Sequence, residues 1–402
     1  MESAIPRLYA TILSEHLSAN RQMAFVSGPR QVGKTTICKG LAGKAHTLNW
    51  DNQADRQNIL AGPDRIAELL GLDQLSQQPR VVAFDELHKY ARWKSFLKGF
   101  FDSLSPEVRI LFTGSSRLDV FRRGGDSLMG RYFLFRMHPL SVGELLDVTV
   151  PPKIFRLPKP LEKAEWDALW KHGGYPEPFS KRNATFSRRW QSTRRNQLLR
   201  EEVRDLTQIH ELTQLEALAM ILAGRSGQQL VYGNLAKDVQ VSADTAKRWI
   251  ETLCSLHFGF LVRPWFQNVA KAIRKEPKWY LRDWSEIEDA GARAETFMAC
   301  HLLKAVEGWT DLGLGNFELR HVRDKDQREV DFVVIRDGKP WFLVEVKSSE
   351  TKLSPSLAYF HDQLKTKHAF QVVTDLEYVN ADCFATGRPT VVPAKTFLSQ
   401  LL

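Results

Sequence analysis

Cysteine is scarce in this sequence. The 402-residue chain has four, far apart and without a Cys-x-x-Cys pair: Cys38, Cys254, Cys300 and Cys383. This spacing argues against a zinc site or a disulfide framework, which need closely or regularly spaced cysteines. It predicts a protein that works in a reducing cytoplasm.

Long apolar runs and targeting signals are also absent. No apolar stretch reaches the roughly 18 residues that a membrane-spanning helix needs, so we expect no membrane association. The first seven residues contain no basic segment followed by an apolar one, which argues against a secretory signal.

Acidic residues are outnumbered by basic ones. The chain has 56 Lys and Arg against 47 Asp and Glu, a formal charge of +9, which is weak evidence for a nucleic-acid partner. Hydrophobic residues make up 43% of the chain and charged residues 26%, the balance of a soluble globular protein. The length allows two or three domains.

Patterning divides the chain into three segments, 1–150, 151–287 and 288–402. The first alternates short apolar runs with amphipathic stretches, which predicts an α/β domain with helices on both faces of a parallel sheet. The second is mostly helical in pattern. The third begins with a helix and continues with strands, which predicts a further α/β domain. The runs expected as buried parallel strands in the first segment are 23–26, 46–50, 81–84 and 110–113.

A phosphate-binding motif follows the first of these strands. The segment Gly28-Pro29-Arg30-Gln31-Val32-Gly33-Lys34-Thr35 fits the pattern G-x-x-x-x-G-K-[ST] in full, and a helical stretch begins at Thr36. The backbone amides of this loop and helix start would surround phosphate oxygens. Lys34 would reach the β- and γ-phosphates of ATP, and the Thr35 hydroxyl would hold Mg²⁺.

Two carboxylates end the third apolar run. Asp85 would hold Mg²⁺, directly or through water, and Glu86 would polarise the water that attacks the γ-phosphate. The pair favours hydrolysis over binding alone. The structural alternative is a solvated acidic turn after a buried strand.

Polar and basic residues follow the fourth strand. Ser115 or Ser116 could sense the γ-phosphate, with a capped turn as the alternative. Arg131 is our first candidate, and Arg117 our second, for an arginine finger acting across a subunit boundary. A structural ion pair is the alternative for either arginine. A finger of this kind implies a homo-oligomer.

These motifs resemble the AAA+-type ATPases of bacteria and archaea in which a P-loop domain is joined to a C-terminal PD-(D/E)XK nuclease-like domain. The resemblance covers nearly the whole chain. It implies a C-terminal α/β domain of the restriction-endonuclease-like fold. The segments that carry it are 28–35, Phe84-Asp85-Glu86, Thr113-Gly114-Ser115-Ser116, Gly130-Arg131, 138–144, Gly173-Gly174-Tyr175-Pro176-Glu177-Pro178 and a C-terminal acidic set.

The second segment is rich in arginine. Residues 181–200 contain no acid and seven cations: Lys181, Arg182, Arg188, Arg189, Arg194, Arg195 and Arg200. On a helix these cations would cover most of the surface, and we expect Arg188, Arg189, Arg194 and Arg195 to contact DNA phosphates. The alternative is a basic helix that contacts an acidic neighbouring domain.

A helix-turn-helix pattern follows over 230–262. Ser242 would cap a second helix over 243–254, with Lys247 and Arg248 exposed on it. Residues 258–262 and 278–281 would form the hairpin of a winged helix. Such modules bind DNA or serve as plain structural modules.

The third segment carries the residues that a PD-(D/E)XK nuclease uses. Asp331 and Glu345 would hold Mg²⁺ or Mn²⁺, Lys347 would orient the attacking water, and Glu295 could add a third carboxylate. The structural alternative for a lone Glu-x-Lys is a solvated strand face. For Asp331 to share a face with Glu345 and Lys347, we expect a three-residue or otherwise odd-length connection, 336–338, between two antiparallel strands.

Together these features predict an oligomeric ATPase that uses ATP and Mg²⁺, acts on DNA and carries a metal-dependent nuclease-like domain. The alternative is an ATP-driven switch or protein-remodelling factor whose C-terminal domain binds partners or DNA without cutting. An ATP-licensed defence nuclease or toxin would share the same chemistry.

Overall fold

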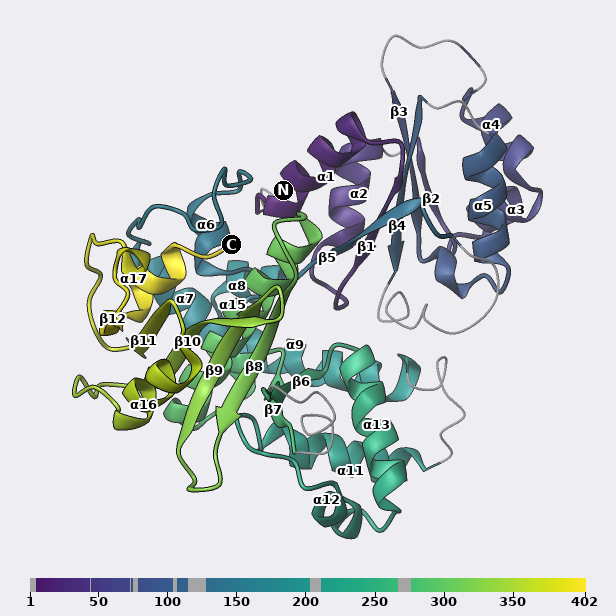
Figure 1. Cartoon of the computed structure of the whole chain (residues 1–402). Coiled ribbons are helices and arrows are strands. Elements are labelled where there is room, and N and C mark those ends of the chain that lie inside the picture. The colour runs from purple at the N-terminus through teal and green to yellow at the C-terminus, as the bar shows by residue number, and fades with distance from the viewer. Residues whose placement is uncertain are drawn as a thin grey trace. The chain divides into compact units, whose positions relative to one another are not determined.

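The computed structural model describes residues 5–43, 45–72, 74, 79–103, 107–114, 128–202, 211–266 and 276–402. The chain divides into two compact units, Met1–Pro139 with Val148–Val150, and Leu140–Asp147 with Pro151–Leu402 (Figure 1). The second unit takes in both the helical segment and the C-terminal segment, because one sheet runs through them.

The first unit contains a five-stranded parallel sheet in the order β2-β3-β4-β1-β5. Figure 1 shows α1 and α2 on one face of this sheet and α3, α4 and α5 on the other. The α/β prediction is therefore confirmed for this unit. Its elements are α1 (Leu8–Ala19), β1 (Met23–Ser27), α2 (Lys34–Ala42), β2 (Thr47–Asn49), α3 (Gln53–Leu60), α4 (Pro63–Leu69), β3 (Arg80–Asp85), the 3₁₀ helix η1 (Leu87–Lys89), α5 (Trp93–Ser103), β4 (Val108–Gly114) and β5 (Tyr132–Arg136).

The four predicted strands are all present as β1 to β4. The prediction omits β5, although residues 132–135 are apolar. This strand lies at the edge of the sheet, and its Phe133 is exposed. The buried strands put their carboxyl ends side by side, which is where ligands bind in open α/β sheets.

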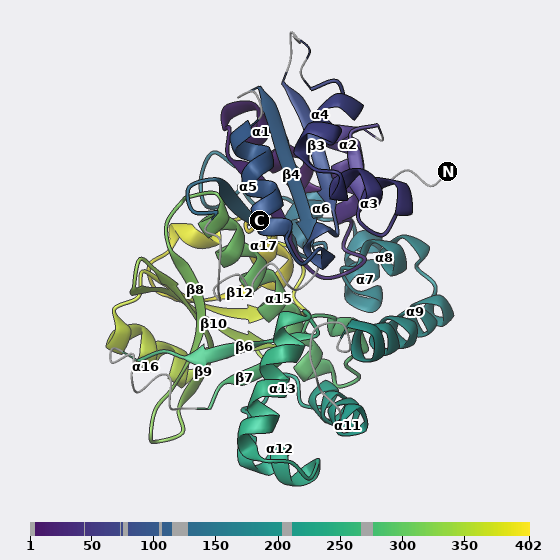
Figure 2. The same ribbon diagram turned by 90° about the vertical axis from the view of Figure 1, so that its right-hand side faces the viewer.

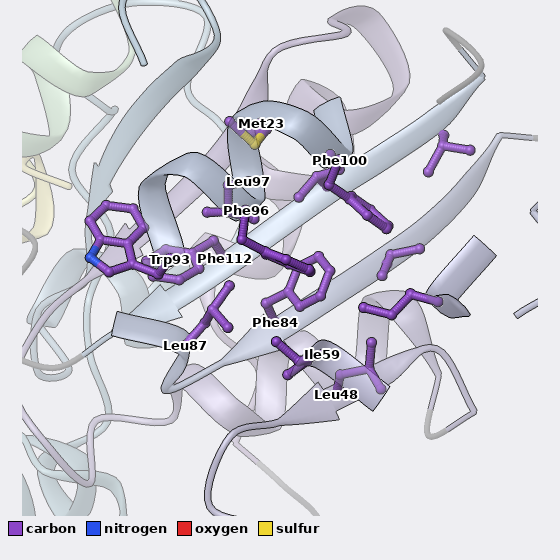
Figure 3. Close-up of a cluster of buried hydrophobic side chains, with 14 of the residues drawn as sticks. Met23, Leu48, Ile59, Phe84, Leu87, Trp93, Phe96, Leu97, Phe100 and Phe112 are labelled. Atoms are coloured by element: carbon purple, nitrogen blue, oxygen red, sulfur yellow. The ribbon is translucent and has the colours of Figure 1, made fainter. Parts of the chain in front are cut away.

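An aromatic core holds these strand ends in place (Figure 3). Phe84 of β3 lies edge-on to Phe96 and Phe100 of α5, and Trp93 stacks on Phe112 of β4. All five side chains are buried. Rings of this size bury much apolar surface in a defined geometry, so α5 fixes β3 and β4 behind the residues that follow them.

The second unit contains a seven-stranded mixed sheet in the order β12-β11-β10-β9-β8-β6-β7. Its strands are β6 (Gly259–Pro264), β7 (Lys278–Leu281), β8 (Phe317–Arg323), β9 (Glu329–Arg336), β10 (Lys339–Lys347), β11 (His368–Val373) and β12 (Pro389–Pro393). Its helical elements are α6 (Val142–Leu146), α7 (Lys163–His172), α8 (Pro176–Lys181), α9 (Ala184–Gln197), the π-helix η3 (Leu198–Glu202), α11 (Leu212–Ala223), α12 (Tyr232–Asp238), α13 (Ala243–Ser255), the 3₁₀ helices η4 (Trp284–Glu286) and η5 (Cys383–Ala385), α15 (Ala290–Asp311), α16 (Pro355–Leu364) and α17 (Ala394–Ser399).

A helix-turn-helix precedes the hairpin of β6 and β7. Figures 1 and 2 show α11, α12 and α13 grouped beside these two strands. The hairpin is antiparallel, with Val262 opposite Lys278. At its other edge β6 pairs with β8 in parallel, Arg263 opposite Arg320. The hairpin is therefore part of the C-terminal sheet.

The connection between β9 and β10 differs from the prediction. Lys339 pairs with Arg336, so two residues form the turn, and the expected three-residue connection is wrong. Gly338 still has the positive φ (79°) that a tight turn favours. An irregularity between Pro340 and Phe342 then shifts the register by one residue.

Candidate nucleotide-binding site and a carboxylate cluster

The phosphate-binding loop lies between β1 and α2, as the motif predicts. Gly28 packs so closely on the backbone of Met137 that an added Cβ would lie 2.3 Å from the Met137 carbonyl oxygen. Gly33 has a φ of +105°, in a region that L side chains rarely adopt. Both glycines are needed for the loop to turn directly into the N-terminus of α2, where amides can face an anion.

Lys34 is buried against this loop. Its Nζ donates to the carbonyl oxygens of Gly28, at 2.7 Å, and Pro29, at 2.8 Å. A phosphate oxygen is a stronger acceptor for an ammonium group than a neutral carbonyl is. The loop thus holds the Lys34 ammonium next to the position at which the motif predicts the phosphates.

Asp85 joins the ends of three neighbouring strands and the P-loop helix. Its Oδ2 accepts hydrogen bonds from the Thr35 hydroxyl at 2.8 Å and from Asn49 Nδ2 at 3.3 Å. Its Oδ1 accepts a hydrogen bond from the Thr113 hydroxyl. Asp85 is 2% exposed. The Thr35 and Asp85 oxygens are the hard donors that Mg²⁺ prefers, so these residues fit an Mg²⁺ that arrives with a nucleotide.

Glu86 follows Asp85 in a left-handed conformation, with φ of 57°. A non-glycine residue with this backbone is uncommon and is often part of a functional site. Burial raises the pKa of Glu86, and the positive charges of Lys89 and Lys34 only partly oppose this. Among the described residues, no donor forms a hydrogen bond with Glu86 Oε2. A carboxylate held in this way is suited to accept a hydrogen bond from water.

The residues predicted downstream of β4 have different outcomes. Ser115, Ser116 and Arg117 lie outside the described residues. Arg131 forms a bidentate ion pair with Asp102 at the end of α5, with both N–O distances 2.9 Å. The structural alternative for Arg131 is therefore realised within this chain.

Three residues around this site were not predicted as site residues. Thr113 and Asn49 contact Asp85, and the buried Arg7 donates to the carbonyl oxygens of Val32 and His138. Thr113 and Asn49 could have been predicted from the sequence, because each is a polar residue at the carboxyl end of an apolar strand. An isolated arginine far from the motif gives no such signal.

Most of the cations in the arginine-rich segment have protein partners. Arg182 pairs with Glu165, Arg195 with Glu286 and Arg200 with Glu216. Arg194 is 6% exposed, donates to the Tyr175 hydroxyl and lies over the Tyr175 ring. Arg188 and Arg189 are exposed on α9 and form no ion pair with other described residues.

The segment Gly173–Pro178 has a structural role. It connects α7 to α8, and an added Cβ at Gly173 would lie 2.6 Å from Asp283 Oδ1. Tyr175 is fully buried, and Glu177 Oε2 accepts a hydrogen bond from Trp190 Nε1 at 3.1 Å. These contacts pack α8 against α9.

The helix-turn-helix residues lie where the pattern puts them. Ser242 caps α13, because its hydroxyl accepts a hydrogen bond from the Thr245 amide at 3.1 Å. Lys247 and Arg248 are exposed on this helix, whereas Trp249 and Ile250 are buried beneath it.

The acids of the C-terminal segment form two groups. Beyond the irregularity near Trp341, Glu345 follows Leu343 by two residues on β10, so both point to the face that α16 covers. Glu345 Oε1 pairs with Lys347 Nζ at 2.9 Å. In β9 two residues lie between Val330 and Val333, opposite the single residue His321 of β8, so β9 has one extra residue there. A bulge of this kind re-aims side chains.

Asp331 stands at this bulge and has further partners. Its Oδ1 lies 3.2 Å from Lys278 Nζ, and its Oδ2 accepts a hydrogen bond from the Val346 amide at 2.9 Å. Lys278 Nζ also contacts Glu295 and Glu329. We call these four side chains, Lys278, Glu295, Glu329 and Asp331, the Lys278 cluster. The register of β9 and β10 runs from Val344 opposite Phe332 to Glu345 opposite Asp331, so these two acids come together through the shift near Trp341 and not through a three-residue connection.

Charge and burial act together in these groups. Burial and then the charge of Asp331 raise the pKa of Glu295 to about 7, and the same two causes raise that of Glu345 to about 7. Burial lowers the pKa of Lys278, but the carboxylates of Asp331, Glu295 and Glu329 outweigh it, so the pKa of Lys278 is raised. Lys278 is thus a cation in this structure.

The residues present do not fit the metal that the resemblance implies. The ammonium of Lys278 lies among the carboxylates that would have to hold the ion. Within the part of the chain that the structure describes, no group of three His, Cys, Asp or Glu side chains is arranged to bind a metal.

Comparisons with known proteins agree with the N-terminal geometry. Residues 20–146 match the model of the AAA domain family, residues 163–286 a domain of unknown function (DUF8612) and residues 290–396 a second one (DUF4143). Uncharacterized proteins of Mycobacterium bovis and Mycobacterium tuberculosis are each 28% identical over 346 residues, which is 83% of this chain and 72% of theirs. These matches support an AAA-type ATPase. None of the helices described here is long and apolar enough to cross a membrane.

Proposed function

We propose that this AAA-type chain hydrolyses ATP at the β1–α2 loop and uses the cycle to control a second unit that binds DNA without cutting it. The observation that carries the ATPase proposal is the network around Asp85, which links the P-loop residue Thr35 to Thr113 with Glu86 next to it.

Each residue has a role in that proposal. The loop amides and Lys34 would bind the phosphates, and Thr35 and Asp85 would hold Mg²⁺, which would supply positive charge to stabilise the transferred phosphoryl group. Glu86 orients the attacking water and accepts its hydrogen bond. Thr113, through Asp85, keeps the carboxylate turned toward Thr35.

The ATPase test compares Lys34→Ala with Glu86→Gln. Lys34→Ala should lose nucleotide binding, because the cation facing the phosphates is gone. Glu86→Gln should bind ATP as the wild type does and turn over at least about 100-fold more slowly. The matched control is Lys39→Ala, an exposed lysine on the same helix. Wild-type turnover in Glu86→Gln would remove Glu86 from the mechanism.

We further propose that DNA contacts the exposed cations Arg188, Arg189, Lys247 and Arg248. The proposal rests on their exposure and on the basic charge of the chain. Arg194 and Arg195 are excluded from it, because their guanidinium groups are engaged inside the protein.

Salt dependence tests this interface. Arg188→Glu with Arg189→Glu should weaken DNA binding alike on all sequences and flatten the dependence of affinity on salt, since fewer counterions are released. Arg182→Glu is the control, because Arg182 already pairs with Glu165. An unchanged salt slope in the double variant would mean that α9 does not touch DNA. An ATPase rate that DNA does not change would favour a protein partner instead.

Metal-dependent cleavage is not part of this proposal, because Glu295 and Asp331, two of the three acids that would hold the metal, contact Lys278. A homo-oligomer remains part of it. In that assembly Arg131 would have to leave Asp102 to reach the nucleotide of a neighbouring copy.

A further inference from the structure

Lys278 lies at the centre of the carboxylate cluster, with its side chain 6% exposed. Its Nζ lies 3.0 Å from Glu295 Oε1, 2.5 Å from Glu329 Oε1 and 3.2 Å from Asp331 Oδ1. The carboxylates come from helix α15 and strand β9, and the ammonium comes from strand β7. Side chains from α15, β7 and β9 thus meet at the Lys278 ammonium.

Donors from the protein also occupy other positions on these carboxylates. The Tyr280 hydroxyl donates to Glu295 Oε1 at 2.6 Å, and the Val346 amide donates to Asp331 Oδ2 at 2.9 Å. Arg323 contacts Glu329 Oε2 at 3.1 Å. A divalent Mg²⁺ or Mn²⁺ needs about six oxygen ligands in a regular arrangement. Several of the lone pairs that would meet this need already accept hydrogen bonds or face a cationic side chain.

The charges in the cluster also argue against a bound divalent metal. Buried carboxylates are stable only when they are paired, and Lys278 and Arg323 supply the compensating charge. A divalent ion bound to the same oxygens would lie next to the ammonium, and repulsion between cations is strong where water is excluded. Metal and ammonium are therefore alternatives at this position.

We propose that Lys278 takes the place of a divalent metal in this cluster, so that the second unit binds no Mg²⁺ or Mn²⁺ there, and that removing the ammonium uncovers a latent metal site. The proposal concerns the second unit alone and does not depend on ATP hydrolysis. It makes Lys278 a positioning residue, which holds α15, β7 and β9 together.

The test is Mn²⁺ binding to the full chain without nucleotide, followed by electron paramagnetic resonance. Wild type should show no Mn²⁺ site that depends on Asp331. Lys278→Met, which keeps the length of the side chain and removes its charge, should gain one Mn²⁺ site, with affinity at least about tenfold above wild type. Adding Asp331→Asn to that variant should remove the site. Lys278→Arg keeps the charge and should gain none.

The matched control is Lys347→Met. It removes the lysine beside Glu345, 31% exposed, and leaves the Lys278 cluster intact, so it should gain no metal site. Loss of Lys278 also leaves three carboxylates unpaired, and the variant can lose stability. Thermal unfolding with and without Mn²⁺ covers this case: a Tm that rises with Mn²⁺ in Lys278→Met, and not in wild type, supports the proposal.

Two results would overturn it. One is a Mn²⁺ site in wild type that Asp331→Asn abolishes. The other is a Lys278→Met variant that is folded by circular dichroism and gains neither Mn²⁺ binding nor a Mn²⁺-dependent Tm.

Discussion

Loss of either partner of the ion pair between Glu144 and Lys304 should strongly destabilise the second unit. Glu144 lies on α6 and Lys304 on α15, with side chains 0% and 2% exposed. One turn earlier on α15, His301 Nε2 accepts a hydrogen bond from the Val142 amide at 3.1 Å. These contacts fix α6 to α15, although α6 directly follows the first unit in the chain.

The size of the effect follows from burial. Removing one partner deprives the other of this ion pair while it stays buried, which costs about 3–5 kcal/mol. In a unit of this size each kcal/mol corresponds to about 2–4 °C in Tm, so Lys304→Met or Glu144→Gln should lower Tm by about 6–20 °C. Glu144→Met with Lys304→Met removes both charges and should cost much less than the sum of the single changes.

The change in Tm is measured by tryptophan fluorescence during heating of the full chain. The signal comes mainly from the second unit, because only Trp50 and Trp93 of the 11 tryptophans lie in the first unit. The control is Lys163→Met, whose pair with Asp167 has side chains 83% and 56% exposed and should contribute less than about 1 kcal/mol. If Lys304→Met is no more destabilising than Lys163→Met, the reasoning fails. It fails equally if the double variant loses the full sum.

Three further outcomes are expected. Thr113→Val should slow ATP hydrolysis, measured by phosphate release, about tenfold, while Thr113→Ser should stay near the wild-type rate. A Thr113→Val rate equal to that of the wild type would show that the hydroxyl does not orient Asp85. Arg131→Ala mixed with Lys34→Ala should recover some ATPase activity if Arg131 acts across a subunit boundary, and no recovery would count against that role. Burial lowers the pKa of His301 to about 3, below its ordinary value of 6.5. As pH falls below 6.5, the unfolded chain therefore takes up a proton at His301 before the folded chain does, so the free energy of unfolding should decrease as pH falls. His301→Gln should reduce that slope by up to about 1.4 kcal/mol per pH unit in urea titrations, whereas an unchanged slope would mean that His301 is not buried in its neutral form.

Much of the first unit could be predicted because its signals are local. The loop motif, the strand before it and the two acids after β3 are each contained in a few adjacent residues. Their convergence follows from the rule that parallel strands place their carboxyl ends at one edge. The same rule brings Thr113 and Asn49 to Asp85, so both could have been named from their place at strand ends.

The C-terminal site could not be predicted in this way, because its geometry depends on register. The extra residue at Asp331 and the shift near Trp341 each reverse the alternation of side chains, and neither leaves a clear mark in the sequence. The two-residue turn at Asp337 is correct for a tight hairpin, but parity counted from it holds only for regular strands. The role of Lys278 was also hidden, since it lies 53 positions before Asp331.

The place of Lys278 on β7 has a practical consequence for work with excised pieces of this protein. A fragment that starts near residue 290, where the last family match begins, keeps Glu295, Glu329 and Asp331 but loses both Lys278 and Tyr280. Its carboxylates would be left with a charge deficit that any divalent ion in the buffer can fill. If Lys278 replaces a metal, such a fragment should bind a divalent ion at these carboxylates that the whole chain does not bind there. Measurements on the isolated piece would then not describe the C-terminal segment of the whole chain.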